Sequence, residues 1–365
     1  MKKTSLILVC ILFAFVLAFS GCSSNQPAQT PPQQQDQTTE PPAESENTFT
    51  LVYSDWAPEN DNLCEIAAQA AVMLEERSNG RIKMETHYGG SLLAQNDVFA
   101  GVTTGVADIV RFSSTMTSGV LDLNQVFNRL FEVESPDMPN LGMVYSEMLT
   151  QVPELQQEME QAGARWLAVR ALLGNNLHTA GKVVRVPDDV KGMKILCVEN
   201  SAAYISSLGG EAVTAPQAEF YTNLERGPAE GELTNWSEID SYNHLEVLKY
   251  HTLLGKNGTD AGGMGYLINL DTWNSLPADL RQLVAEVYQW ATDEGEKADL
   301  EAKTRIEAEA LEKGNTLIVL TPEEMQLWRD YMKPVNDVWV QETEAKGLPA
   351  QKAIDELFKL FEEYR

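Results

Sequence analysis

The runs FTLVYS (Phe49–Ser54), RIKMETH (Arg81–His87) and ADIVRF (Ala107–Phe112) decide the fold, because they are β-like and alternate with helical stretches. Residues 62–78 carry apolar side chains at helical spacing, and residues 97–104 form a shorter helical stretch. A β-α-β-α-β order favours parallel strands joined by right-handed crossovers. We therefore expect an α/β protein.

The carboxyl ends of these strands are the first place to look for a binding site. Small molecules bind to open α/β sheets beyond the carboxyl ends of the strands. In this sequence that edge carries Trp56 after the first strand, and Arg111 and Phe112 at the end of the third. Aromatic walls with a few fixed polar groups suit a pocket for a small organic molecule. We expect Trp56 and Phe112 to form apolar walls.

The N-terminus is typical of a bacterial lipoprotein signal. Lys2 and Lys3 precede the apolar run Leu6–Phe19, which is shorter than the roughly 20 residues that span a bilayer. The run ends in Ala-Phe-Ser-Gly-Cys, so residues 1–22 resemble a signal peptide with a lipobox, and Cys22 is the expected lipidation site. An ordinary secretory signal with an incidental cysteine is the alternative.

Residues 23–48 are rich in Gln, Pro, Thr and Glu and lack large apolar side chains. Such a segment cannot build a core, and we expect a flexible linker between the lipid anchor and the globular body. The protein is then extracytoplasmic and anchored to the membrane, in a periplasm or on the outer face of the cytoplasmic membrane. The body that follows is long enough for two lobes rather than one.

The composition excludes several classes of function. The chain has 54 Asp and Glu against 27 Lys and Arg, a net charge of −27, so we expect no nucleic-acid partner. An anionic ligand would have to be held by local positive groups inside a cleft. Cys64 and Cys197 are the cysteines of the body, and their spacing matches no zinc or redox motif. We expect two core thiols, and no metal or cofactor.

Seven segments in one order carry a resemblance to a known family. They are EERSNGRIK (75–83), HYGGSLL (87–93), VTTGVADI (102–109), PDDVKGMKI (187–195), LGGEAV (208–213), EFYTNLERGPAEG (219–231), and EVLKYHT (246–252) with WNSLP (273–277). Each segment is weak evidence alone, but together they cover most of the body. The chain resembles the DctP-type solute-binding subunits of TRAP transporters.

The resemblance implies a two-lobed fold of the type II periplasmic-binding-protein kind, with a ligand cleft between the lobes. It places lobe I at residues 49–170 and lobe II at 171–256. Residues 257–365 then return to lobe I and add bracing helices. The run RWLAVRAL (165–172) would be the first crossing between the lobes, residues 251–255 would lead into the return, and GYLINL (265–270) would be the strand back in lobe I.

The same resemblance implies a function in transport. The protein would capture a small organic solute by lobe closure, as a monomer and without catalysis, and deliver it to TRAP membrane permease subunits. A binding lipoprotein of an ABC importer or of a sensory receptor on the same scaffold is the alternative. An anchored hydrolase would need a nucleophile with a base, or a metal cluster, and the sequence shows neither pattern.

One position departs from the family. Members commonly carry the arginine of a G-x-K-I-R-V-like motif in this strand, where its planar fork pairs with a carboxylate. Here the segment is GMKILCV (192–198), and Leu196 takes that place. Either Arg170 or Arg111 replaces it, with Arg170 preferred, or the ligand is not the usual carboxylate. A calcium-bridged ligand is a further alternative.

The second half supplies the remaining site candidates. Tyr221 lies in the E-x-Y motif of the family, and Asn235 and Trp236 follow a glycine-rich turn where family members often present ligand-contacting groups. We expect these residues to line the cleft, around a carboxylate-bearing solute that is partly apolar or aromatic.

The four histidines, His87 on a strand, His178 in a loop, and His244 and His251 around a helix end, are interpreted as structural.

Overall fold

The computed structural model describes residues 48–365 except 60, 118 and 216–218. The expected signal peptide with Cys22, and all of the linker but its last residue, lie outside the described residues. None of the helices in the described part is long and apolar enough to cross a membrane.

The first sheet has five strands in the order β2-β1-β3-β10-β4. β1 (Phe49–Ser54) pairs in parallel with β2 (Ile82–His87) and β3 (Ile109–Ser113), as the sequence pattern predicts. β10 (Gly263–Asn269) then lies antiparallel between β3 and β4 (Ala164–Ala171). The late strand β10 thus joins the two earlier parts of the sheet.

Two short helices connect the parallel strands. α1 (Asn62–Arg77) begins after Asp61, whose side chain accepts hydrogen bonds from two amides of the first turn. It ends before Asn79 and Gly80, which both adopt positive φ and turn the chain into β2. α2 (Val98–Thr103) leads in the same way into β3.

The second sheet has six strands in the order β11-β9-β5-β8-β6-β7. They are β5 (Asn176–Thr179), β6 (Lys194–Cys197), β7 (Glu211–Thr214), β8 (Gly231–Thr234), β9 (Tyr250–Leu253) and β11 (Thr316–Val319). Strand β11, which pairs in parallel with β9, is not predicted from the sequence, because four residues between two long helices give little periodicity. His178, which the sequence interpretation places in a loop, lies on β5.

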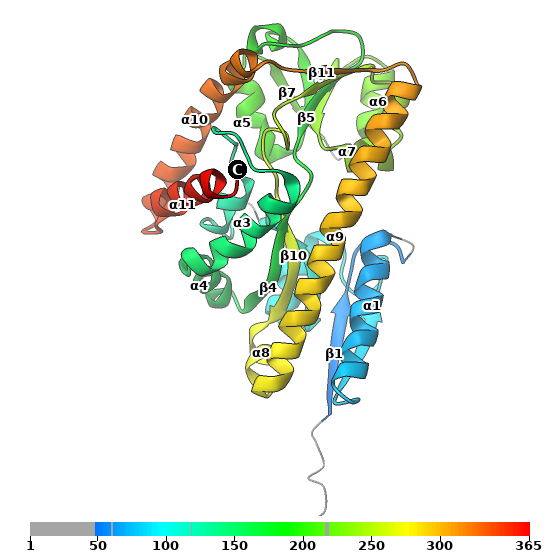
Figure 1. Ribbon diagram of the computed structural model, residues 1–365, viewed down its shortest axis with the longest axis vertical. Coiled ribbons are helices and arrows are strands. Elements are labelled where there is room, and N and C mark those ends of the chain that lie inside the picture. Colours follow the sequence, from blue (N-terminus) through cyan, green and yellow to red (C-terminus); the bar gives the residue numbers. More distant parts are fainter. Residues whose placement is uncertain (1–47, 60, 118, 216–218) are drawn as a thin grey trace, which may run out of the picture. The chain divides into compact units, whose positions relative to one another are not determined.

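Nine further helices complete the described chain with short 3₁₀ turns. They are α3 (Met138–Gln151), α4 (Glu154–Gln161), α5 (Glu199–Ser207), α6 (Phe220–Glu225), α7 (Trp236–Ser241), α8 (Leu270–Ser275), α9 (Ala278–Glu312), α10 (Pro322–Glu344) and α11 (Ala350–Glu363). The long helix α9 contacts α1 and β4 of the first sheet's layer and also α7 and β11 of the second (Figure 1). It therefore braces both sheets, as the family resemblance implies.

The chain changes sheet at residues 172–175, after β4, at residues 254–262, before β10, and once more through α8 and α9 on the way to β11. The first two crossings are hydrogen-bonded to each other, because the amide of Leu172 donates to the carbonyl of Gly262 and the amide of Asn175 to that of Asp260. A Cβ at Gly174 would lie 1.4 Å from the carbonyl oxygen of Asn257. The close approach of the two crossings thus requires glycine.

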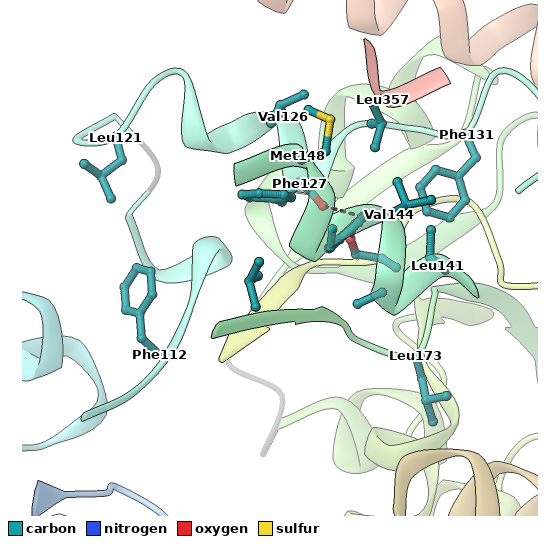
Figure 2. Close-up of a cluster of buried hydrophobic side chains, with 14 of the residues drawn as sticks. Phe112, Leu121, Val126, Phe127, Phe131, Leu141, Val144, Met148, Leu173 and Leu357 are labelled. Carbon is teal, nitrogen blue, oxygen red and sulfur yellow. Dashed lines mark hydrogen bonds between the residues drawn. The ribbon is translucent and has the colours of Figure 1, made fainter. Parts of the chain in front are cut away.

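The largest apolar cluster packs α3 and α11 against the face of the first sheet that α1 and α9 leave free. Figure 2 shows Val144 and Met148 of α3 beside Phe127, with Leu357 of α11 next to them. Cys64 and Cys197 are both buried and free, as predicted. The predicted α/β fold with two sheets is confirmed.

Candidate functional site

Two buried arginines flank strand β10 on the face of the first sheet that α1 and α9 cover. In the strand register, Arg111 of β3 is opposite Tyr266, and Arg170 of β4 is opposite Met264. Their side chains are 5% and 4% exposed. All four residues line one cavity of about 10 Å³, which has room for roughly one water molecule.

Arg111 is balanced by carboxylates of the protein itself. Its Nη2 lies 2.8 Å from Oδ1 of Asp55, which is fully buried, and its Nη1 lies 3.1 Å from Oδ1 of Asp61. The guanidinium also stacks over Trp56, 4.5 Å from the ring centroid. Arg111 therefore ties the loop after β1 and the start of α1 to β3, and both of its terminal nitrogens are engaged.

Arg170 retains an unsatisfied donor. Its Nη1 donates to the carbonyl of Ala171 at 3.2 Å and to the carboxylate of Asp299 on α9. Its Nη2 is buried and has no hydrogen-bond partner among the described residues. A buried donor without an acceptor costs roughly 1–3 kcal/mol, which a bound acceptor would recover. Arg111 also keeps one buried nitrogen without a partner, its Nε, but Arg170 is the arginine of the pair whose free nitrogen is a terminal one.

Glu296 adds a second acidic group beside Arg170. It precedes Asp299 by three residues on α9, so both carboxylates lie on one side of that helix. Burial raises the pKa of Glu296 to about 7, although the nearby Arg170 acts in the opposite direction. The Glu296 carboxyl therefore exchanges its proton near neutral pH.

Phe112 lies on the opposite face of the first sheet from the two arginines. It is fully buried between Phe99 and Trp166, with ring centroids 5.6 Å and 5.3 Å away. The structure therefore places it in the apolar core, away from the cavity that Arg111 and Arg170 line.

The candidates from the second half lie on elements of the second sheet. Leu196 is fully buried on β6, and Asn235 caps α7 by accepting the amide of Glu238 at 3.1 Å. The hydroxyl of Tyr221 on α6 donates to Glu246 at 2.9 Å. None of the hydrogen bonds that these side chains form in the described part of the chain reaches Arg111 or Arg170.

Trp236, the last of these candidates, belongs to a buried polar cluster that sequence reasoning missed. Its ring centroid lies 5.0 Å from those of both His178 and His251. The Nδ1 atoms of the two histidines are 2.7 Å apart, and their other nitrogens contact the carbonyl of Thr234 and the amide group of Asn315. The pairing follows from the register of β5 and β9, which the sequence alone does not give.

The contacts of this cluster assign one proton to each histidine. The carbonyl of Thr234 accepts from Nε2 of His178, so Nδ1 of His178 accepts from Nδ1 of His251, and Nε2 of His251 accepts from Asn315. Burial lowers the pKa of His251 to about 4 and lowers that of His178 well below its ordinary value. Both rings are therefore neutral at physiological pH.

The fully buried pair of His244 and Glu232 lies in the same sheet layer, with Nδ1 and Oε1 2.8 Å apart. The sequence interpretation of His244 as a structural histidine did not identify this partner. The two partners are separated in the sequence by an irregular stretch that includes α7, so no regular sequence spacing predicts their pairing.

A wider depression of about 450 Å³ opens at the carboxyl ends of β1 and β2. Its lining is Pro58, Glu59, Thr86, His87, Tyr88, Gly89 and Ser91. The lining holds no arginine or lysine, so it attracts an anion less strongly than the two arginines do. Among the described residues, no group of three His, Cys, Asp or Glu side chains could hold a metal ion.

Residues 53–343 match the DctP family, described as bacterial extracellular solute-binding protein, family 7. The chain belongs to this family. The C4-dicarboxylate-binding periplasmic protein DctP of Vibrio cholerae is 25% identical over 274 residues, covering 73% of this chain and 80% of the relative. A solute-binding protein of Verminephrobacter eiseniae is 26% identical over 277 residues, covering 71% and 79%.

Solved structures share the fold of this DctP-family protein. A TRAP periplasmic solute-binding protein of Desulfovibrio salexigens superimposes with a TM-score of 0.76 at 24% identity, covering 87% of this chain and 97% of that one. A TRAP solute-binding protein of Rhodoferax ferrireducens, in complex with copurified benzoate, gives 0.73 at 18% identity, covering 87% and 98%. The predicted family, the two-lobed fold and the solute-binding function are confirmed.

Proposed function

We propose that this protein captures a small organic acid outside the cytoplasm, holds its carboxylate on Arg170 and delivers it to TRAP membrane permease subunits. The observation that carries the proposal is the buried, unpaired Nη2 of Arg170 at the cavity between the first sheet and α9. A guanidinium is the side chain best suited to a carboxylate.

The residues around Arg170 favour a solute with one carboxylate and an apolar or aromatic body. A second carboxylate would need a second cation, but Arg111 is engaged by Asp55 and Asp61, and Leu196 stands where the family commonly has an arginine. Tyr266 and Met264 supply apolar surface at the cavity. Benzoate in the Rhodoferax ferrireducens protein is a ligand of this chemical type.

Capture requires a change in the site, because the cavity at Arg170 is far smaller than the 300–1,000 Å³ of ordinary ligand pockets. The cavity is enclosed by the first sheet, α1 and α9, so α9 has to shift away from the sheet. The paired crossings at residues 172–175 and 254–262 are where the two lobes can rotate as it does so. We expect a solute to bind an open form and to stabilise closure around it.

The remaining features of the proposal concern the whole protein. We expect lipidation at Cys22, a monomeric state, and release of the solute without chemical change. The alternative is that the protein, on the same scaffold, serves an ABC importer or a sensory receptor. Transport assays with and without the TRAP membrane subunits would distinguish the two functions.

The proposal is tested by thermal-shift screening of carboxylates, starting with benzoate, succinate and D-glucuronate. A solute at 100 times its dissociation constant stabilises the protein by about 2.7 kcal/mol. We expect Arg170→Gln to abolish the shift, measured against the variant's own unliganded melting temperature, while the exposed Arg226→Gln keeps it. Equal shifts in the wild type and Arg170→Gln would remove Arg170 from the site.

A further inference from the structure

The Nη1 group of Arg170 has no hydrogen left for a ligand. A guanidinium has five N–H donors, and two of them are on Nη1. One contacts the carbonyl of Ala171 and the other the carboxylate of Asp299. A ligand that pairs end-on with both terminal nitrogens would need one of these Nη1 hydrogens. The carbonyl of Ala171 belongs to the backbone of β4 and is fixed there, so Asp299 is the partner that can move to let such a pair form.

The other edge of Arg170 lies against α9. A Cβ at Gly295 would come within 3.1 Å of Nε and 3.4 Å of Nη2, so these two nitrogens face the helix backbone where Gly295 has no side chain. Leu63 of α1 approaches the same point to 3.2 Å. A carboxylate that pairs side-on with Nε and Nη2 has no room there while α9 keeps its place.

We propose that Asp299 is a built-in competitor for Arg170, which a solute carboxylate must displace to form a bidentate pair. The inference rests on the proposed function and adds a residue that sets affinity and selectivity. Asp299 keeps the buried arginine neutralised in the unliganded protein, and its side chain is 16% exposed, so it has a path toward solvent. Competition from Asp299 favours solutes whose own carboxylate forms a strong ion pair with Arg170, because that pair replaces the one lost with Asp299.

Displacement of Asp299 adds negative charge near Glu296. The charged neighbours of the Glu296 carboxyl are Arg170 on β4 and Asp293 and Asp299 on α9. From α3 it meets the backbone of Gly142, so closely that a Cβ on that glycine would overlap Oε2 of Glu296. Burial already raises the pKa of Glu296 to about 7, and a second carboxylate at Arg170 raises it further. Solute binding is then accompanied by proton uptake, so affinity is higher at pH 6 than at pH 8.

The test is calorimetric titration of the full chain with benzoate, succinate and D-glucuronate at pH 6 and pH 8. We expect Asp299→Asn to bind the carboxylate probes roughly tenfold more tightly than the wild type, the usual order of such a coupling. Glu301→Gln is the matched control, because it removes the same charge from an exposed position of the same helix, away from Glu296, and should leave affinity unchanged. Glu296→Gln should remove the pH dependence.

The outcomes separate this inference from the proposed function. Unchanged or weaker binding by folded Asp299→Asn would overturn the competition, and weaker binding would make Asp299 a positioning residue. If the wild type binds a probe and Arg170→Gln does not, the proposed function stands whatever Asp299→Asn does. If neither the wild type nor Asp299→Asn binds any probe, the competition is rejected, since removing the competitor should expose Arg170.

Discussion

Arg111 and Arg170 have similar burial but different partners. Both terminal nitrogens of Arg111 are paired, with Asp55 and Asp61, and only its Nε lacks a partner, whereas Arg170 pairs with Asp299 through Nη1 and keeps its terminal Nη2 free. The sequence identifies both arginines, because each lies near a strand end that the fold directs toward the binding edge. It does not distinguish them, because their counter-ions Asp61 and Asp299 are 50 and 129 positions away. Only the packing of α1 and α9 on the sheet decides which arginine is available.

The two neutral histidines of the second sheet make the protein sensitive to acid. Their folded pKa values lie below the ordinary value near 6.5, so below pH 6.5 the unfolded chain binds more protons at these two residues than the folded chain does. The stability that they contribute is complete above pH 6.5 and is lost as the pH falls toward 4. Each proton changes the free energy of unfolding by about 1.4 kcal/mol per pH unit.

We predict that the double variant His178→Leu and His251→Leu loses less stability than the wild type between pH 6.5 and pH 4.5. The measurement is the free energy of unfolding in urea at several pH values. The difference between the two curves is informative, because burial raises the pKa of Glu232 and gives that residue the opposite slope. His87→Leu, a change at a partly exposed histidine, is the control. Parallel curves for wild type and double variant would refute the assignment.

Strand β10 is the element that holds the arginine pair together, since β3 and β4 pair with its two edges. Gly265 lies in its middle, opposite Phe112 and Val169. A Cβ there would fall 1.9 Å from the carbonyl oxygen of Ala168, which is backbone and cannot turn aside. The sheet therefore depends on the absence of a side chain at this position.

We predict that Gly265→Ala destabilises the protein by about 3 kcal/mol or more, at the upper end of overpacking effects. The strands must separate locally to admit the methyl group, which also shifts Arg111 and Arg170 relative to each other. Gly181→Ala is the matched control, because no atom lies within 4 Å of its Cβ position and the residue is exposed. Urea unfolding measures both. Equal stability of the two variants would show that β10 is not held as described.

The strands of the first sheet were predictable from the sequence to within two residues, because alternation and flanking helices mark them clearly. The second sheet was harder. Its strands are four residues long, so β11 was missed and His178 was placed in a loop. Strands this short carry little pattern of their own, and their place depends on partners far away in the sequence.

For the whole molecule, the order of seven family segments was enough to predict the two-lobed fold and the solute-binding function. The site was less predictable. Phe112 and Trp236 are aromatic residues at the expected strand and turn positions, yet the structure buries both completely. The side of the sheet on which a residue lies, and the helices that cover that side, decide between pocket and core. Neither follows from the residue type.

The central claim is that the protein binds one small carboxylate at Arg170 and leaves it unchanged. The most direct measurement is calorimetric titration with the carboxylate that the thermal-shift screen selects, followed by mass analysis of the recovered solute. We predict one solute per chain, recovered intact, and no binding to Arg170→Gln. Conversion of the solute, or equal binding by Arg170→Gln, would contradict the account.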